Sequence, residues 1–226
     1  MPCHRYDHKT ALRLSQLRGC PLSGMRLTQN NKRTLNQVCV PPFDRMILPE
    51  QERHEVLIRL TEAVSLLESS MNAQLIPSTG TNLVYAIRGA RDGKDIAAVQ
   101  GGIVSRKGKV HLSGPCVFDA GGDIARIVLT TVKFDPLMRS AAAIQFSRKT
   151  LAVIEDMFIE CCALDRAKEP PGTTTIDWGV ASCCTEGVPE VIYDHATAPH
   201  EALIRIIGEN PVEIANNIII LSNRIQ

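Results

Sequence analysis

The sequence is poor in aromatic residues and has no long apolar run. Only 4% of its 226 residues are Phe, Tyr or Trp, and a single Trp is present. No apolar stretch approaches the ~20 residues that a membrane-spanning helix needs. The charged N-terminus is not followed by an apolar segment, so a secretory signal is missing as well. We therefore expect a cytoplasmic protein with no membrane partner.

Motifs for metal binding are also missing. The eight cysteines form no C-x-x-C pair, and the histidines show no H-x-H or H-E-x-x-H spacing, so we predict no metal ligands. Cys161-Cys162 and Cys183-Cys184 are adjacent pairs, poorly suited to share one zinc ion or to bridge the fold. We interpret the cysteines as small buried apolar residues in a reducing compartment.

Charge divides the chain into two parts. Residues 1–46 contain eight Lys/Arg and two Asp/Glu, a net charge of +6, whereas residues 47–226 contain 17 and 22, a net charge of −5. We predict a basic, weakly ordered arm over residues 1–47 and one α/β domain over residues 48–226. The arm makes nucleic acid a candidate partner through residues 1–46. It lacks a clear helix-turn-helix, because only residues 11–17 suit an amphipathic helix.

From Pro49 onward, predicted helices and strands alternate. Apolar residues from Val56 to Met71 recur on one helical face. Further helices are predicted at 124–132, 149–158, 176–186 and 211–224, and strands at 83–87, 102–105, 109–113, 141–147, 159–164, 188–193 and 202–207. Residues 102–113 have the pattern of a β-hairpin. Because hairpins and helix-linked strands both occur, we expect a mixed sheet.

Two segments are candidate phosphate sites, although a Walker or dinucleotide glycine loop is missing. Gly121-Gly122 precede a predicted helix start at Asp123. Either the free N–H groups of that helix hold a phosphate, or Asp123 caps the helix itself. Arg139-Ser140 either bind a phosphate, or Arg139 serves the negative end of the preceding helix.

Two loops after predicted strands carry similar alternatives. Asp165-Arg166 follow a strand end, where α/β proteins often bind ligands, but they also suit a solvated charged loop. The same two interpretations apply to Asp194, Glu201 and Arg205, which lie around the loop between the last two strands.

Residues 50–222 contain a series of short sequence motifs. Their residues and their order resemble those of the ThiN domain, the archaeal-type thiamine-phosphate synthase module. These motifs are Leu75-Ile76-Pro77, Asn82–Ala86, Ile124–Leu129, Phe134-Asp135-Pro136, Arg139-Ser140-Ala141, Asp165-Arg166, Glu169-Pro170, Trp178-Gly179, Val191–Asp194 and Ile204-Arg205. The resemblance implies a three-layer αβα fold with a mixed β-sheet, similar to class II aldolases (AraD-like), and usually a homodimer. It implies thiamine phosphate or a related phosphorylated heterocycle as the ligand.

Carried over by position, the resemblance implies a set of ligand-binding residues. They are Asn82, Arg126, Asp135, Arg139, Ser140, Asp165, Arg166, Asp194 and Arg205. The synthase reaction joins hydroxymethylpyrimidine diphosphate to a thiazole phosphate and releases diphosphate. It needs positive charge, from arginine or Mg²⁺, on the leaving group.

The sequence departs from the family where the synthases carry catalytic cations. Gly102 stands where they resemble V-P-G-R-I-V with an arginine, and Asp123 stands where they have a histidine. Gln145 replaces another cation. Losing one transition-state donor costs about 10²- to 10³-fold in rate. We therefore favour a non-catalytic thiamine phosphate sensor. The alternative is a synthase in which Mg²⁺, or a nearby cation such as Arg106, Lys107 or His111, compensates for the missing charges. A pocket adapted to another phosphorylated heterocycle is a third hypothesis.

Overall fold

The computed structural model describes residues 49–164, 175–195 and 201–225. The chain divides into Met1–Met46 and Ile47–Gln226, and all described residues belong to the second unit. The basic arm predicted at 1–47, with its candidate nucleic-acid contact, therefore lies outside the described residues. The predicted loop at Pro170-Pro171-Gly172 lies outside them too.

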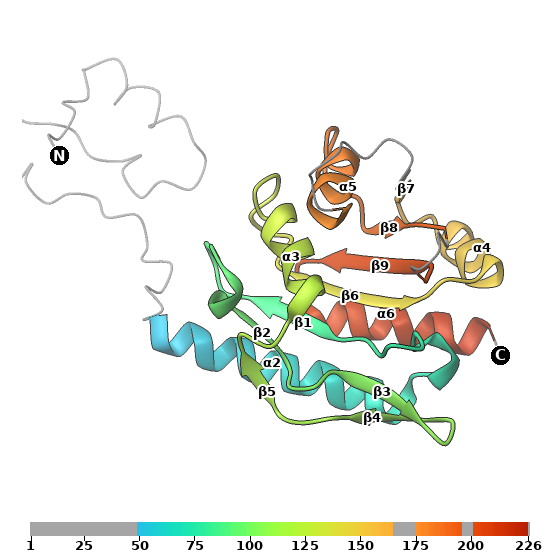
Figure 1. The fold of residues 1–226 in the computed structure, drawn as a ribbon, viewed down its shortest axis with the longest axis horizontal. Helices are drawn as coiled ribbons and strands as arrows, with labels where there is room; N and C mark the ends of the chain where they lie inside the picture. The colour runs from blue at the N-terminus through green and yellow to red at the C-terminus, as the bar shows by residue number, and fades with distance from the viewer. Residues whose placement is uncertain (1–48, 165–174, 196–200, 226) are drawn as a thin grey trace, which may run out of the picture. The chain divides into compact units, whose positions relative to one another are not determined.

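A seven-stranded mixed sheet forms the centre of the domain (Figure 1). Its strands are β1 (Leu83–Ala86), β2 (Ile96–Val99), β5 (Cys116–Phe118), β6 (Ser140–Gln145), β7 (Cys161–Ala163), β8 (Val191–Tyr193) and β9 (Leu203–Gly208). They lie in the order β5-β2-β1-β6-β9-β8-β7. Neighbours are antiparallel except β7 and β8, which are parallel. Strands β3 (Ile103–Arg106) and β4 (Lys109–Leu112) form the predicted hairpin as a separate two-stranded sheet.

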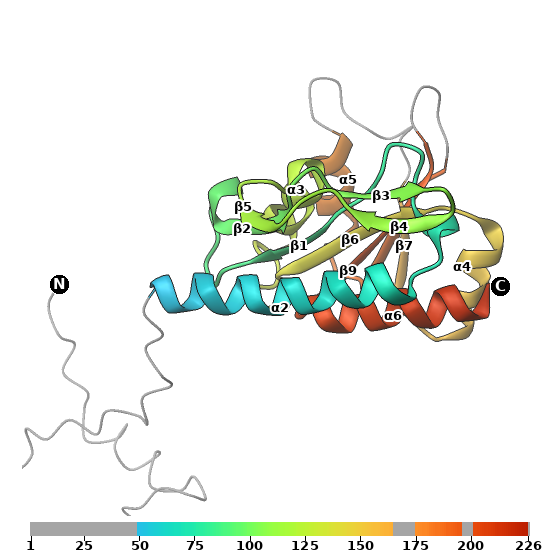
Figure 2. The same ribbon diagram turned by 90° about the horizontal axis from the view of Figure 1, so that it is seen from below.

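Helices cover both faces of the sheet, which confirms the predicted three-layer αβα fold. Helices α2 (Pro49–Ser70) and α6 (Pro211–Arg224) pack side by side on one face, while α3 (Gly122–Thr131) and α5 (Thr175–Cys183) pack together on the other (Figure 2). Helix α4 (Arg148–Asp156) contacts α6. Two short 3₁₀ turns, η1 (Ala73–Leu75) and η2 (Gly93–Asp95), complete the described elements.

Side-chain alternation along the strands builds a separate core on each face. Leu83 and Tyr85 of β1 join the core under α2 and α6, which we call the α2/α6 core. Val84 and Ala86 join the core under α3 and α5, the α3/α5 core. Strands β2 and β5 were not predicted, because their short apolar runs carry no periodicity that separates them from loops.

No helix in the described ranges is both long enough and apolar enough to cross a membrane. Helix α2 has the necessary length, but charged residues occur throughout it.

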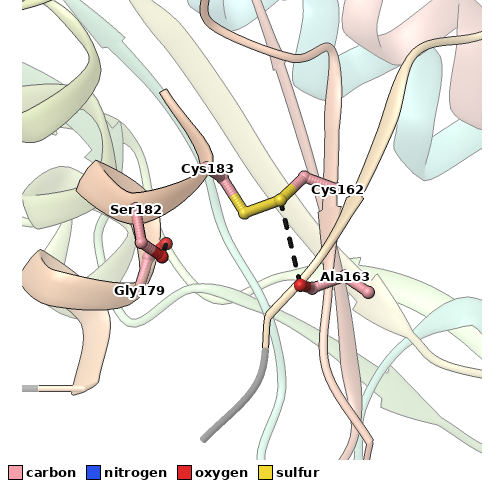
Figure 3. The surroundings of a disulfide bond; sticks show 5 residues. All are labelled: Cys162, Ala163, Gly179, Ser182 and Cys183. Carbon is pink, nitrogen blue, oxygen red and sulfur yellow. Dashed lines mark hydrogen bonds between the residues drawn. A yellow bond between two sulfur atoms is a disulfide. The ribbon is translucent and has the colours of Figure 1, made fainter. Parts of the chain in front are cut away.

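The prediction that the adjacent cysteine pairs do not bridge the fold is wrong. Cys162 of β7 and Cys183 of α5 form a disulfide whose Cα atoms are 5.9 Å apart (Figure 3). Consecutive strand residues face opposite sides, so Cys162 turns toward the α3/α5 core and Cys161 toward the other core. Each pair of adjacent cysteines thus contributes one sulfur atom to the disulfide. Cys184 is buried, as expected, and Cys116 and Cys161 are half-buried free thiols.

Candidate functional site

A buried ion pair between Arg205 and Asp194 is the centre of the candidate site. Arg205 lies on β9, where it pairs with Ala143 of β6 and Ile192 of β8. Because it is two residues from Ile207, a member of the α3/α5 core, its side chain points to that face. Its Nη2 donates to Asp194 Oδ2 at 3.0 Å, and Asp194 Oδ1 accepts from Leu203 N at 2.9 Å. Arg205 is 6% exposed and Asp194 1%.

The second terminal nitrogen of Arg205 is unpaired. Among the described residues, Arg205 Nη1 is buried and has no hydrogen-bond partner. An unsatisfied buried donor of this kind costs about 1–3 kcal/mol, and more on a charged group. Guanidinium groups bind phosphate oxygens through such N–H groups. The ion pair therefore fixes a guanidinium whose Nη1 makes no hydrogen bond to the described residues.

Helix α3 lies on the same face of the sheet and begins one residue earlier than predicted. Its N-cap is Gly121, which makes no side-chain cap bond. The interpretation of Asp123 as the N-cap is therefore wrong, because its exposed side chain belongs to the first turn. The carboxylate still complements the positive end of the helix.

Arg126, one turn into α3, contacts helix α5. Its Nη2 donates to Asp177 Oδ2 at 2.7 Å. The Asp177 hydrogen bond and charge, with a further contribution from Asp123, raise the pKa of Arg126 above its usual value. Both partners are partly exposed, so the pair stabilises the fold only weakly. The sequence did not indicate Asp177, because its role depends on the packing of α5 against α3.

Asn82 is buried just before β1 and joins β1 to β2. Its Nδ2 donates to Val99 O at 2.8 Å, and its Oδ1 accepts from the N–H groups of Val99 and Leu83. Most of the hydrogen-bonding capacity of this predicted ligand residue is therefore used within the fold. The bonds to Val99 hold the start of the turn that leads to Gly102.

Gly102 occupies a backbone conformation that suits glycine alone. Its φ is +80°, and a Cβ there would lie 2.8 Å from the backbone oxygen of Thr81. Its N–H donates to Val99 O, and its carbonyl accepts from Ser113 N. An arginine at this position would be strained.

Three predicted ligand residues lie elsewhere, in the turn before β6 and at the first residue of that strand. Arg139 turns toward the α2/α6 face, where Nη2 donates to Tyr85 Oη at 2.7 Å and Nη1 lies 3.6 Å from Glu52 Oε1. Ser140 is buried and donates to Val84 O, while Asp135 accepts from Leu137 N in a turn. The structure does not bring these residues to Arg205.

Arg139 lines a charged pocket of about 230 Å³ beside the starts of α2 and α6. Its wall contains the arginines 59, 88 and 139 and the glutamates 52, 55, 209 and 213. The opposite charges nearly balance, and Arg139 is already engaged with Tyr85 and Glu52. The pocket therefore favours neither an anionic nor a cationic ligand.

Asp165 and Arg166, also predicted ligand residues, lie outside the described residues. The sequence suggests His195 as a surface-loop residue and does not group it with Phe146 and Tyr193, but the three rings pack together at the ends of β6 and β8. The Phe146 and Tyr193 centroids lie 6.0 Å apart, and His195 meets both rings edge-on. The antiparallel order of β6, β9 and β8 brings them together, and spacing in the sequence does not reveal this.

The carboxylates of the described site do not form an Mg²⁺ site. Mg²⁺ prefers octahedral oxygen ligands, often one or two carboxylates with substrate phosphates. Among the described residues, no group of three or more His, Cys, Asp and Glu side chains converges. Asp177 and Asp194 are both paired with arginines. We derive no chemical step through a metal.

Comparisons with known proteins agree with this architecture. The family model for thiamine-phosphate synthase ThiN matches residues 59–220. The chain is 32% identical over 169 residues to the bifunctional thiamine biosynthesis protein ThiDN of Methanocaldococcus jannaschii, covering 74% of this chain but only 40% of that protein. It is 29% identical over 148 residues to the thiamine-phosphate synthase ThiN of Methanothermobacter thermautotrophicus, covering 62% of this chain and 78% of that protein.

A solved structure shows the same fold. The crystal structure of the C-terminal domain of protein MJ0236 aligns with a TM-score of 0.72 and 31% identity, covering 79% of this chain and 97% of that domain. From the family match and these relatives, the chain belongs to the thiamine-phosphate synthase ThiN family.

Proposed function

We propose that this protein binds thiamine phosphate, or one of its phosphorylated precursors, and senses it without joining the precursors. The unpaired Nη1 of Arg205 carries this proposal. It is a buried, charged donor fixed by Asp194, and a phosphate oxygen of the ligand would complete its hydrogen bonds. Helix α3 lies on the same face of the sheet as Arg205, and its Arg126 is paired with Asp177.

Two positions support binding without efficient synthesis. Departure of diphosphate requires positive charge where negative charge develops. Gly102 offers no side chain and its backbone resists one, while Asp123 places a carboxylate in the first turn of α3. These residues occupy the positions at which the family resemblance places an arginine and a histidine.

Thiamine-phosphate synthesis is the second candidate function, and the names of the relatives favour it. In this reading, cations elsewhere in the chain replace those absent at residues 102 and 123. The residues of this chain would then hold the two heterocycles in an orientation suited to attack.

One pair of measurements separates the two candidates. The full chain is incubated with hydroxymethylpyrimidine diphosphate, thiazole phosphate and Mg²⁺, and thiamine phosphate is quantified by mass spectrometry. Calorimetry measures thiamine phosphate binding on the same preparation. We expect binding and no product above the enzyme-free control. The M. thermautotrophicus relative, assayed in parallel, serves as the positive control.

The other outcomes are equally informative. Product formation would identify a synthase and exclude a purely sensing role. Absence of binding up to millimolar thiamine phosphate would overturn the proposal and favour a different phosphorylated heterocycle. A Gly102→Arg variant is unsuitable for rescue because of the close Thr81 oxygen. Asp123→His, at an exposed position, changes the charge without that strain.

Three further features belong to the proposal. We place the protein in the cytoplasm as a homodimer, and we assign nucleic-acid contact to residues 1–46. A sensor of this kind would connect ligand binding to control of thiamine synthesis or transport. A salt-dependent DNA-binding assay of the full chain tests the contact, and light scattering tests the dimer.

A further inference from the structure

Helix α5 packs on α3 through the buried Val180 of the α3/α5 core, and a disulfide adds a covalent link to strand β7. The Arg126–Asp177 pair links it to α3. Gly179 packs so closely on Leu164, just after β7, that a Cβ at Gly179 would lie 2.2 Å from Leu164 Cδ1. Cys183, at the last residue of α5, is bonded to Cys162 of β7. Figure 3 shows the bond between strand and helix.

Strand β7, the other end of this link, is itself weakly held. It has three residues, lies at the edge of the sheet and pairs only with β8 among the described strands. Edge strands and short helices belong to the least stable parts of a domain. A covalent bond between two such elements therefore has a large effect on their local stability.

The other free thiols of the described residues do not compete for this pairing. Burial raises the pKa of Cys184 and of Cys116, and burial together with Glu155, Glu190 and Glu160 raises the pKa of Cys161. All three remain protonated and are poor nucleophiles near neutral pH. Cys162 and Cys183 are only half-buried, so a small thiol or disulfide reaches them.

We propose that Cys162 and Cys183 form a reversible redox link that controls ligand affinity at the Arg205 site. In the oxidising direction, the two thiols lose two protons and two electrons to a low-molecular-weight disulfide. One thiolate attacks that disulfide, and the mixed disulfide formed is then displaced by the second cysteine. The products are the Cys162–Cys183 bond and two small thiols; an excess of small thiol reverses the reaction.

The link connects to the site through α5 and α3. The disulfide holds α5, α5 places Asp177, and Asp177 holds Arg126 on the helix that covers the Arg205 face. Reduction releases α5 from β7 and weakens this support. This coupling to affinity rests on the proposed function, whereas the redox link itself does not.

The test uses the full chain in glutathione buffers that range from reduced to oxidised. Thiol counting by mass spectrometry follows the bond, thermal unfolding follows stability, and calorimetry follows binding of thiamine phosphate. Hydrogen exchange reports on α5 directly. On reduction, we expect two additional thiols, a Tm lower by about 5–15 °C, faster exchange in residues 175–183, and affinity weaker by at least about fivefold.

Matched variants isolate the bond. Cys162→Ser and Cys183→Ser should each behave as the reduced chain in every buffer. Cys161→Ser, one residue away, should keep the full redox response. Loss of the response in Cys161→Ser would overturn the assignment of the bond.

The remaining outcomes separate this inference from the proposed function. Failure of the bond to form in any buffer overturns the redox link. Formation of the bond with unchanged affinity, in a chain that binds thiamine phosphate, overturns the control of binding. If neither redox state binds thiamine phosphate, the proposed function fails and control of this ligand fails with it. The exchange rate of α5 then still decides whether the link exists.

Discussion

Arg205 uses only one of its two terminal nitrogens within the described structure, and this suggests a direct test of ligand binding. Replacement by lysine keeps the charge beside Asp194 but removes the planar fork that offers a second donor. We expect Arg205→Lys to fold and to bind thiamine phosphate about 10- to 100-fold more weakly, as for one lost charged hydrogen bond. Calorimetry measures the affinity, and circular dichroism verifies the fold.

The control for Arg205→Lys is Arg53→Lys. Arg53 also contacts a carboxylate, Asp95, and lies over the Phe118 ring, far from Arg205 in the fold. Its replacement should leave the affinity unchanged. Equal weakening in both variants would show that the effect is not specific to Arg205. Arg205→Ala is a poorer test, because it removes the ion pair of the buried Asp194 and costs about 3–5 kcal/mol of stability.

Single residues were the least predictable level of this structure. The sequence marked Asn82 and Ser140 as ligand residues, yet both mainly hydrogen-bond to the backbone of other segments, Val99 and Val84. Ser140 and Val84 are 56 positions apart and meet only through the pairing of β1 with β6. Polar residues that bind ligands and those that join strands look alike until the register is known.

At the scale of elements, the close packing of α5 on Leu164 makes a quantitative prediction. Gly179→Ala adds helix propensity worth about 1 kcal/mol. Its new methyl group would also overlap the Leu164 side chain, at a cost of about 1–3 kcal/mol. We expect a net loss of up to about 2 kcal/mol in the free energy of unfolding, measured by urea denaturation under oxidising conditions.

A double variant identifies the cause. In a Leu164→Ala background the added methyl group finds space, so Gly179→Ala should become neutral or stabilising. A double-mutant cycle gives the coupling between the two positions. If Gly179→Ala destabilises both backgrounds equally, the overlap with Leu164 is not responsible. Stability would then depend on the helix backbone alone.

Elements with strong periodicity or clear end signals were predictable. Helix α6 begins at Pro211 after the cap residue Asn210, whose Oδ1 accepts from Val212 N, and the turn residues between β3 and β4 marked the hairpin. Strands β2 and β5 were not predicted, because runs of only four residues in β2 and three in β5 show no usable periodicity. The disulfide was not predicted either, because it depends on the packing of α5 beside β7, which local sequence patterns do not reveal.

At the scale of the whole molecule, the pattern of helices and strands predicted a mixed α/β domain. The three-layer αβα arrangement was predicted only from the ordered series of family motifs. Alternation of helices and strands restricts the fold class but does not order the strands. The series of motifs from Leu75 to Arg205 specified a known arrangement. It could not show that Arg139 and Arg205 occupy opposite faces of the sheet, because that depends on side-chain alternation in β9 and on the turn before β6.

The division of charge leads to the last prediction. Every described core residue lies at or beyond Val56, and residues 1–46 carry the net charge of +6. A chain of residues 47–226 should therefore unfold within about 2 °C of the full chain, because no part of either described core is removed. It should also lose any affinity for duplex DNA that the full chain has, because its own net charge is −5.

Salt dependence tells whether the arm acts through phosphates. The eight basic residues of the arm set the upper limit on phosphate contacts, so we expect a slope of log K against log salt between zero and about −7. Fluorescence anisotropy with a labelled duplex at several salt concentrations measures it for both chains. DNA binding by residues 47–226 with an unchanged slope would move the contact to the α/β domain. A large drop in Tm on removal of residues 1–46 would make the arm part of the folded unit.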